Sequence, residues 1–362
     1  MKKILIVTSE YGSGHKTPAE ALKQECIQQG HVAEFFDFKD IVGAFTERVT
    51  KEFHDFATTH IPLLHRGLAA ATDSNTILDV IIALTPAKVS ENLEARVREM
   101  KPDIIVATFP AANRLIIELK SKYHFQFVCI VTDLKSLHAY WIAPHTDAYI
   151  VALPETKTAL EALGAPKNKI EVLGYPLRSA FFEEKDTEQI RKKLSIPPNA
   201  FVALYMTHSA PDAFAETLAK KMDSARGITP IIICGKYTQL KKTLTKSLRN
   251  AHVLGYVNNM DEYLSVANVA IGKAGTGFLL EAASVGCPVI ITKYLKPQED
   301  GNATLFASRG FGYIETTATR AMGRILSIQN ESTTTRATRA TAMRALMPSR
   351  STSSIVRFIT SL

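Results

Sequence analysis

The stretch ILIVTSEYGSGHKTPAEAL, residues 4–22, passes from an apolar run through a glycine turn into a helical pattern. Its first residues are continuously apolar, which is typical of a strand buried on both faces of a sheet. Gly12 and Gly14 allow a tight turn and let another molecule approach the backbone closely. The apolar residues that follow recur at helical spacing, so the N–H groups of a helix N-terminus point toward the turn. The stretch therefore predicts a strand–turn–helix unit that presents His15 to a ligand.

The residues of this turn allow two interpretations: a turn that presents His15 to a ligand, and a phosphate-binding or dinucleotide-binding loop. The second interpretation would leave His15 without a role. The dinucleotide fingerprint, however, requires a third glycine at the position where this chain has Thr17. The turn therefore disfavours a nicotinamide cofactor, and its assignment depends on the rest of the chain.

The composition is that of a globular protein with room for two domains. The chain has 362 residues, of which 46% are hydrophobic and 22% charged. No apolar run approaches the roughly 18 residues that a membrane-spanning helix requires, and the run near the N-terminus is too short for a signal peptide. The four cysteines lack the spacing of a metal or redox site, which fits a reducing cytoplasm.

The net charge of +8 is unevenly distributed along the chain. From residue 318 onward there are seven Arg and a single acidic residue, Glu331. Such a surplus suits nucleic acid or an anionic membrane surface. The chain lacks the interleaved aromatic and basic residues of nucleic-acid modules, so we expect no nucleic-acid partner.

Buried-strand patterns alternate with amphipathic helical patterns, which predicts parallel sheets with helices on both faces. The alternation stops over residues 176–200, a segment rich in proline and charge, and then restarts. We therefore expect two doubly wound α/β domains, residues 1–175 and 201–330, joined by this linker, with the ligand site in the cleft between them. The expected strands are 3–8, 31–37, 103–107, 126–131, 147–151, 169–172, 201–206, 229–234, 252–254, 269–271, 288–292 and 312–314.

Two segments depart from this alternation. Residues 43–76 form a long insertion that combines seven large apolar side chains with basic residues. We expect this insertion to lie in a membrane interface, with Phe53, Phe56 and Leu64 inserted, although packing on the first domain is the alternative. Residues 331–362 form a separate tail rich in Ser, Thr and Arg, and the weak periodicity of residues 331–354 predicts partial disorder there.

A second strand–turn–helix unit is VAIGKAGTGFLLEAASVGCPVIITKYLKPQEDGNATLF, residues 269–306. A buried strand leads to the turn Gly275–Thr276–Gly277, and the helix N-terminus there suits a diphosphate. Glu281 falls one turn into the helix, where a carboxylate suits both hydroxyls of a ribose. The alternatives are a plain turn and a solvated Glu281. The polar side chains at the next strand-to-helix turn, which suit the hydroxyls of a sugar, are Gln298, Glu299 and Asn302.

On these residues the chain resembles the family of monogalactosyldiacylglycerol synthases and processive diacylglycerol glucosyltransferases. This family is related to the N-acetylglucosaminyl transferase of peptidoglycan synthesis. The resemblance implies the GT-B fold, in which two Rossmann-like domains face each other across a cleft. It extends from GSGH to about residue 314 and rests on the motifs GSGHKTPAEAL, KPDIIVATFP, VTDLKSLHAYW, IEVLGYPLR, IIICGKYTQL, VLGYV, GKAGTGFLLEA and PQEDGNATLF.

The resemblance assigns roles to the matching positions. The C-terminal domain would bind a UDP-sugar, with Glu281 at the ribose and the turn at 275–277 at the diphosphate. The N-terminal domain would bind diacylglycerol. The remaining donor-binding positions are Gly255, Tyr256 and Val257 near uracil, and Gln298, Glu299 and Asn302 at the hexose. The acceptor-binding positions are Gly12, Gly14, His138, Trp141, Phe53, Phe56 and Leu64.

Three positions differ from the family pattern. Gly275–Thr276 replaces a glycine pair, Pro297 stands where the family has glycine, and the loop MTHSAPDA, residues 206–213, lacks glycine. A loop without glycine approaches a phosphate less closely, so His208 or Ser209 would supply hydrogen-bond donors there.

Glycosyl transfer needs a base for the acceptor hydroxyl and stabilisation of the charge on the departing UDP. Histidine has an ordinary pKa near neutrality, so His15 is the expected base and Asp133 is its rival. The dipole of the helix after Gly275 would stabilise the diphosphate without a metal or other cofactor. In-line attack would invert the anomeric carbon and yield a β-glycoside.

The expected function is therefore transfer of a hexosyl group from UDP-glucose or UDP-galactose to diacylglycerol. The protein would be cytoplasmic and attached peripherally to an anionic membrane surface, the inner face of the cell membrane. Two alternatives stay open: a UDP-sugar epimerase of the same fold, and a UDP-sugar-binding regulator without activity. The sequence leaves open the choice of hexose, the addition of further sugars and the oligomeric state.

Overall fold

Two six-stranded parallel sheets form the frame of the computed structural model. The described chain divides into two compact units. Unit 1 consists of Met1–Leu177 together with Ser351–Leu362, and unit 2 consists of Arg178–Arg350. Within the described residues no helix is both long enough and apolar enough to cross a membrane. The described residues are 1–9, 13–37, 87–207 and 213–362.

The sheet of unit 1 has the strand order β2-β1-β3-β4-β5-β6, and every pairing is parallel. Its central strands are apolar on both faces, so both faces must be covered. The strands are β1 (Lys3–Thr8), β2 (Val32–Asp37), β3 (Ile104–Ala107), β4 (Gln126–Ile130), β5 (Ala148–Val151) and β6 (Ile170–Val172).

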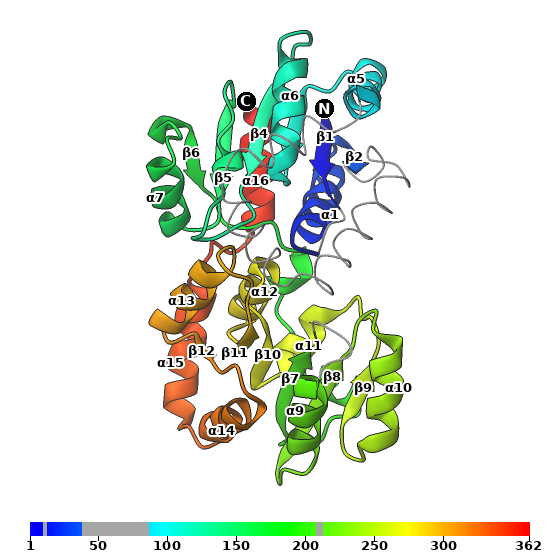
Figure 1. Cartoon of the computed structure of the whole chain (residues 1–362), viewed down its shortest axis with the longest axis vertical. Helices are drawn as coiled ribbons and strands as arrows, with labels where there is room; N and C mark the ends of the chain where they lie inside the picture. Colours follow the sequence, from blue (N-terminus) through cyan, green and yellow to red (C-terminus); the bar gives the residue numbers. More distant parts are fainter. Residues whose placement is uncertain (10–12, 38–86, 208–212) are drawn as a thin grey trace, which may run out of the picture. The chain divides into compact units, whose positions relative to one another are not determined.

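Helices pack on both faces of this sheet. On one face α1 (Ser13–Gln28) and α16 (Ser351–Ser361) lie side by side, the blue and red helices of Figure 1. The chain between β4 and β5 is an irregular crossover that contains the 3₁₀ helix η2 (Ala139–Trp141). The other face is covered by α5 (Ala87–Met100), α6 (Asn113–Lys120) and α7 (Pro154–Ala162), and the remaining 3₁₀ helices of the unit are η1 (Pro110–Ala112) and η3 (Lys167–Lys169).

The sheet of unit 2 has the strand order β12-β11-β10-β7-β8-β9 and is also parallel throughout. The strand order changes direction after β2 in unit 1 and after β9 in unit 2, which is the doubly wound arrangement. The strands are β7 (Phe201–Met206), β8 (Ile228–Ile233), β9 (His252–Leu254), β10 (Val269–Lys273), β11 (Val289–Lys293) and β12 (Gly312–Ile314).

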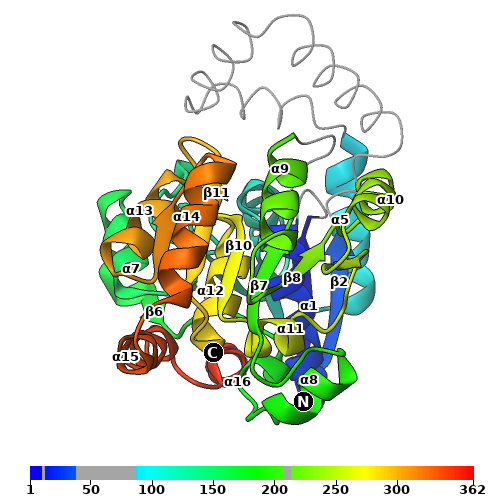
Figure 2. The same cartoon turned by 90° about the horizontal axis from the view of Figure 1, so that it is seen from below.

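The helices of unit 2 again cover its sheet. Figure 2 shows α9 (Ala213–Asp223) and α14 (Ala318–Gln329) side by side on one face, where their apolar residues share a core with β7, β8 and β10. At the end of β10, a Cβ on Gly272 would lie 2.7 Å from the ring of Phe278, so glycine permits the close packing of α12. The helices are η4 (Ser179–Phe181), α8 (Thr187–Lys193), α9 (Ala213–Asp223), α10 (Thr238–Ser247), α11 (Met260–Val266), α12 (Thr276–Val285), α13 (Asp300–Ser308), α14 (Ala318–Gln329) and α15 (Thr333–Arg344).

The expected fold class is confirmed, and all twelve strands lie within two residues of the expected ranges. The division of the chain differs in two places. The expected linker, residues 176–200, forms η4 and α8 within unit 2. The expected tail, residues 331–362, is helical: α15 belongs to unit 2, whereas α16 returns to unit 1.

The expectation of a partly disordered tail was wrong because its hydroxyl groups have buried partners. Ser351 donates a hydrogen bond to the Tyr175 carbonyl at 2.7 Å, and Thr352 donates to the Leu177 carbonyl at 2.6 Å. Ile355 and Ile359, spaced by one helical turn, are fully buried against the sheet. A Ser/Thr-rich composition therefore conceals an amphipathic helix that completes the core of unit 1.

We expect Ile359→Ala to lower the free energy of unfolding of unit 1 by about 2–5 kcal/mol, because it leaves a cavity under α16. The exposed Arg357 on the same helix supplies the control, and Arg357→Ala should change stability by less than about 0.5 kcal/mol. Trp141, the single tryptophan, is buried in unit 1, so its fluorescence during urea unfolding reports this unit. Equal effects of both substitutions would contradict the role of α16.

Candidate active site

Three threonines lie at the carboxyl ends of neighbouring strands in unit 1. Thr8 ends β1, Thr108 follows β3, and Thr132 follows β4. Because β1, β3 and β4 are consecutive in a parallel sheet, their carboxyl ends meet at one edge. All three threonines are buried, and their polar atoms converge on the first turn of α1. This edge of the sheet therefore presents a cluster of hydroxyl and carbonyl groups to a residue in the first turn of α1.

That residue is His15, and the threonines hold both its backbone and its ring. The hydroxyls of Thr8 and Thr108 donate to the His15 carbonyl at 3.0 and 3.2 Å. Nδ1 of the ring lies 2.9 Å from the Thr108 carbonyl and 2.9 Å from Oγ1 of Thr132. The ring of Phe109 packs edge-on against the imidazole, with centroids 5.2 Å apart. The imidazole is thereby fixed in one orientation.

The Thr108 carbonyl also determines the tautomer of His15. A carbonyl oxygen accepts hydrogen bonds and never donates them, so Nδ1 must carry the proton. In the neutral ring the lone pair is then on Nε2, which has no hydrogen-bond partner among the described residues. Burial lowers the pKa of the imidazole, while the Asp133 carboxylate and the bond to Thr108 oppose that shift. At neutral pH the ring is therefore an uncharged base.

Asp133 and Trp141 form a pair in the crossover after β4. Nε1 of Trp141 donates to Oδ2 of Asp133 at 2.8 Å, and the indole is completely buried. No helix begins at Asp133, so this carboxylate does not cap one. Trp141 therefore orients the carboxylate that acts electrostatically on His15.

The other acceptor-side residues are distributed as follows. His138 begins η2, where its Nδ1 accepts from the backbone N–H of Tyr140 at 3.2 Å and its ring stacks on that of Tyr140 at 4.6 Å. Gly14 lies in the first turn of α1. Outside the described residues lie Gly12, Phe53, Phe56 and Leu64, together with His208 and Ser209.

In unit 2 the turn at Gly275 is joined to the next strand-to-helix turn. Nδ2 of Asn302 donates to the Ala274 carbonyl at 3.1 Å and lies 3.3 Å from Oγ1 of Thr276. Gly275 is the N-cap residue of α12, and Gly277 lies in the first turn of this helix. The N-terminal N–H groups of α12 and the Asn302 amide are thus at one edge of the sheet.

Beside this turn, Lys273 pairs with Glu299 at 2.7 Å. The second carboxylate oxygen of Glu299 accepts from the Leu295 N–H at 2.8 Å, so this carboxylate is held on both sides. Gln298 is exposed to solvent. Lys273 also lies at this site, although the sequence motifs did not single it out. Its position at the end of a buried strand could have identified it, because strand ends lie at the edge of the sheet where ligands bind.

Glu281 lies in α12, one turn beyond this edge, near a charged cluster. The buried Asp261 pairs with Lys185 at 2.9 Å and with Arg178 at 3.5 Å. Burial raises the pKa of the Glu281 carboxyl to about 7; Arg178 acts against this shift and Asp261 adds to it. The pKa of the Glu281 carboxyl is therefore near neutrality, chiefly because of burial.

The segment Gly255–Val257 follows β9 at the same edge of the sheet. Tyr256 is 83% exposed, and a Cβ on Gly255 would meet Gly235 and Lys241 no closer than 3.8 Å. Among the described residues no group of three or more His, Cys, Asp or Glu side chains is arranged to hold a metal ion.

The two units match two different family models. Residues 15–177 match the model described as monogalactosyldiacylglycerol (MGDG) synthase. Residues 212–354 match the model described as the glycosyltransferase family 28 C-terminal domain. The first match contains the His15 and Asp133 site, and the second contains the α12 turn.

Among solved structures, similarity lies in the fold. Acinetobacter baumannii MurG superposes with a TM-score of 0.64 at 13% identity, covering 99% of this chain and 100% of that one. A putative UDP-N-acetylglucosamine 2-epimerase from Listeria monocytogenes gives 0.66 at 13% identity, covering 100% and 97%. Both span the whole chain, which confirms the GT-B fold.

Sequence relatives are more specific. A processive diacylglycerol beta-glucosyltransferase from Bacillus licheniformis is 29% identical over 324 residues, covering 85% of this chain and 82% of that protein. One of the same description from Bacillus cereus strain G9842 is 30% identical over 319 residues, covering 85% and 80%. With this similarity over nearly the full length of both chains, the protein belongs to the family of processive diacylglycerol beta-glucosyltransferases.

Proposed function

We propose that this protein transfers a glucosyl group from UDP-glucose to diacylglycerol, giving a β-glucosyldiacylglycerol. The observation that carries the proposal is the fixed tautomer of His15, whose Nε2 lone pair is available to a ligand hydroxyl. The names of the relatives support the donor and the acceptor, and they favour glucose over galactose. Addition of further glucose units is part of the relatives' description and is proposed here as well.

In the proposed reaction Nε2 of His15 takes the proton of the acceptor hydroxyl. The hydroxyl oxygen then forms a bond to the anomeric carbon as the bond from that carbon to the UDP oxygen breaks. Attack from the opposite side inverts the anomeric carbon and releases UDP. The imidazolium formed at His15 is stabilised by the Asp133 carboxylate, which favours the charged form of the ring.

The donor is held by unit 2. The N-terminal N–H groups of α12 stabilise the diphosphate as negative charge develops on it, with Lys273 beside them. Glu281 accepts hydrogen bonds from the ribose hydroxyls, and Glu299 and Asn302 contact the hexose. Oδ1 of Asn302 is buried and has no hydrogen-bond partner among the described residues, which suits a ligand hydroxyl as its donor. We propose that no metal ion or other cofactor takes part.

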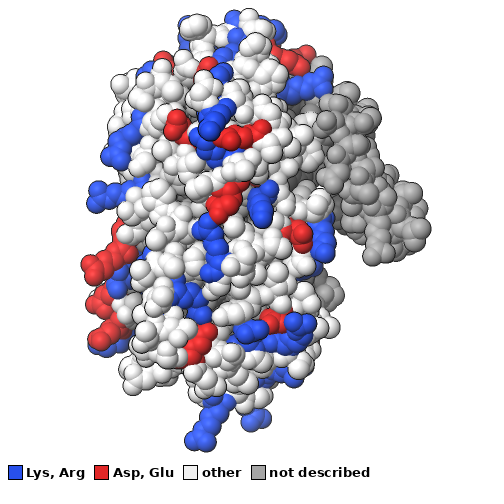
Figure 3. Space-filling view, turned by 90° about the vertical axis from the view of Figure 1, so that its left-hand side faces the viewer, with Lys and Arg blue, Asp and Glu red and all other residues white. Residues whose placement is uncertain are grey.

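Contact with a membrane follows from the acceptor, because diacylglycerol stays in the bilayer. On the face in Figure 3 the Lys and Arg side chains are interspersed with Asp and Glu rather than gathered into a field of one sign. From their composition, we propose that residues 43–76, which lie outside the described residues, supply the apolar and basic contact with an anionic surface. The protein would then be cytoplasmic and peripheral to the membrane.

The decisive experiment supplies diacylglycerol in anionic or neutral vesicles with UDP-glucose, UDP-galactose or UDP-N-acetylglucosamine, and analyses the lipids by mass spectrometry. We expect a hexosyl lipid and release of UDP with UDP-glucose, most strongly on anionic vesicles. Formation of an epimer from UDP-N-acetylglucosamine without lipid would establish the epimerase instead. Binding of UDP-glucose without lipid-dependent release of UDP would establish a regulator.

Nucleotide binding should weaken as the pH falls through about 7, because protonated Glu281 loses an acceptor for the ribose hydroxyls. Uridine is the suitable probe in calorimetry, since it has no phosphate that titrates in this range. Glu281→Gln should weaken binding above that pH by roughly 1.5–3 kcal/mol and abolish the pH dependence. The same pH dependence in this variant would exclude Glu281 from the ribose site.

His15→Ala should retain UDP binding and lower turnover by about 10²–10⁴-fold, as expected for loss of a general base.

Asp133→Asn keeps an acceptor for Nε1 of Trp141 but removes the charge that raises the pKa of His15. The acidic limb of the kcat/KM profile should therefore move to lower pH in Asp133→Asn. A loss of less than tenfold in His15→Ala, with a large loss at every pH in Asp133→Asn, would make Asp133 the base.

A further inference from the structure

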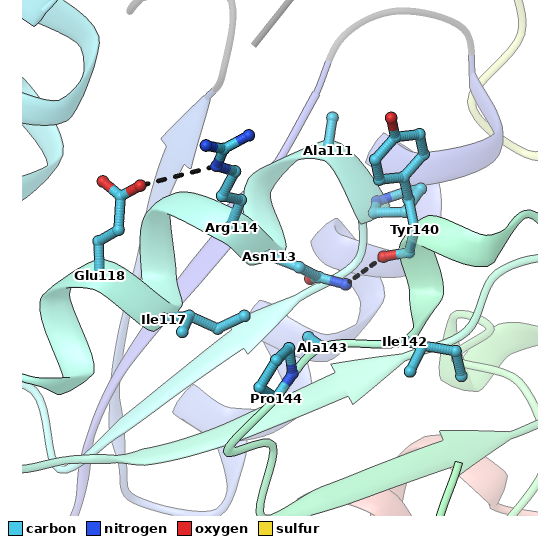
Figure 4. Close-up of a pocket in the computed structure, with 10 residues that line it drawn as sticks. Ala111, Asn113, Arg114, Ile117, Glu118, Tyr140, Ile142, Ala143 and Pro144 are labelled. Carbon is cyan, nitrogen blue, oxygen red and sulfur yellow. Dashed lines mark hydrogen bonds and ion pairs between the residues drawn. The ribbon is translucent and has the colours of Figure 1, made fainter. Parts of the chain in front are cut away.

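A cavity of about 340 Å³ lies in unit 1 between the start of α6 and the crossover that precedes β5. Most of its wall is apolar, as Figure 4 shows. Ile117 extends toward it from α6, and Ile142 and Pro144 face it from the crossover. The volume lies at the lower end of the range for small-molecule sites. The apolar lining residues are Pro110, Ala111, Ile117, Ile142, Ala143 and Pro144.

The polar groups around the cavity already have partners in the protein. Nδ2 of Asn113 donates to the Tyr140 carbonyl at 2.9 Å, and its Oδ1 accepts from Sγ of Cys129. Arg114 and Glu118 pair at 3.7 Å with side chains about half exposed, so their charges are directed to water. A polar occupant would lose hydrogen bonds to water without regaining them, whereas a hydrocarbon chain would gain from leaving water.

Two short segments of the chain connect the walls of the cavity to residues of the His15 site. Pro110 and Ala111 directly follow Phe109, whose ring contacts the imidazole of His15. On the other side, Tyr140 stacks on His138 and is followed by Trp141, which holds Asp133. The two segments that fix the proposed base and its carboxylate therefore form the walls of the cavity.

We infer that this cavity is an acyl-chain subsite, which takes one hydrocarbon chain of the lipid acceptor while the glycerol hydroxyl lies at His15. The inference rests on the proposed function and deepens it, because it makes chain length a determinant of acceptor choice. The hydrogen bond from Asn113 to Tyr140 joins the two walls and fixes the width of the subsite. Transfer of one methylene group from water into such a site is worth about a factor of four in binding.

The test compares short-chain and long-chain diacylglycerols in mixed micelles. In the parent protein kcat/KM should rise with chain length by at least about tenfold, because several methylene groups are buried. Ile117→Trp fills the cavity and should reduce kcat/KM for the long-chain diacylglycerol to that for the short-chain one. The kcat with the short-chain diacylglycerol and the affinity for UDP should stay within about twofold of those of the parent protein. Ser121→Trp, which adds the same ring at the exposed end of α6, should behave as the parent. Chain-length dependence that survives in Ile117→Trp would overturn the subsite.

A second measurement is independent of turnover. A diacylglycerol with a photoreactive diazirine at the end of one chain should label the peptide that contains Ile142 and Pro144, and Ile117→Trp should abolish that label. Labelling without formation of any glycolipid would refute the proposed function and leave the subsite standing. Formation of glucosyldiacylglycerol with labelling confined to other peptides would refute the subsite and leave the function standing.

Discussion

Parallel pairing of β1, β3 and β4 is the constraint on which the chemistry of unit 1 depends. It brings the ends of three strands, separated by up to 124 residues in the chain, to one edge of the sheet. Thr8, Thr108 and Thr132 meet there and bind the backbone and ring of His15. A parallel sheet buried on both faces leaves few other places for polar groups, so its carboxyl edge concentrates them.

Unit 2 has the same architecture, but the groups at its sheet edge suit a ligand of different charge. Its edge presents the N-terminus of α12, the Lys273–Glu299 pair and the Asn302 amide, which suit an anionic, hydroxyl-rich ligand. Unit 1 presents a neutral imidazole and a carboxylate, which suit removal of a proton. The fold thus provides equivalent positions in both units, and the residues placed there divide the proposed reaction into base catalysis and stabilisation of a leaving group.

Much of this arrangement could be predicted from local pattern. The strands follow from continuous apolar runs, and the turn after β10 follows from Gly275, the N-cap residue of α12. The prediction of a partly disordered tail failed because hydroxyl residues such as Ser351 and Thr352 are typical of polar loops. Their hydroxyls satisfy backbone carbonyls at Tyr175 and Leu177, and this pairing joins segments more than 170 residues apart. Composition records polarity and carries no information about such distant partners.

The sequence by itself determined the fold class, because periodicity and glycine turns act over short distances. Its family resemblance supplied the candidate donor-site residues, and it left His15 and Asp133 as candidate bases. The tertiary structure alone decided which ring nitrogen of His15 carries the proton, since that depends on the Thr108 carbonyl, 93 residues away. It also revealed that Trp141 holds Asp133, that Lys273 faces Glu299, and that α6 and the crossover enclose an apolar cavity. Each of these depends on contacts between distant segments, and a tautomer, a carboxylate orientation or a cavity exists only once those segments have packed.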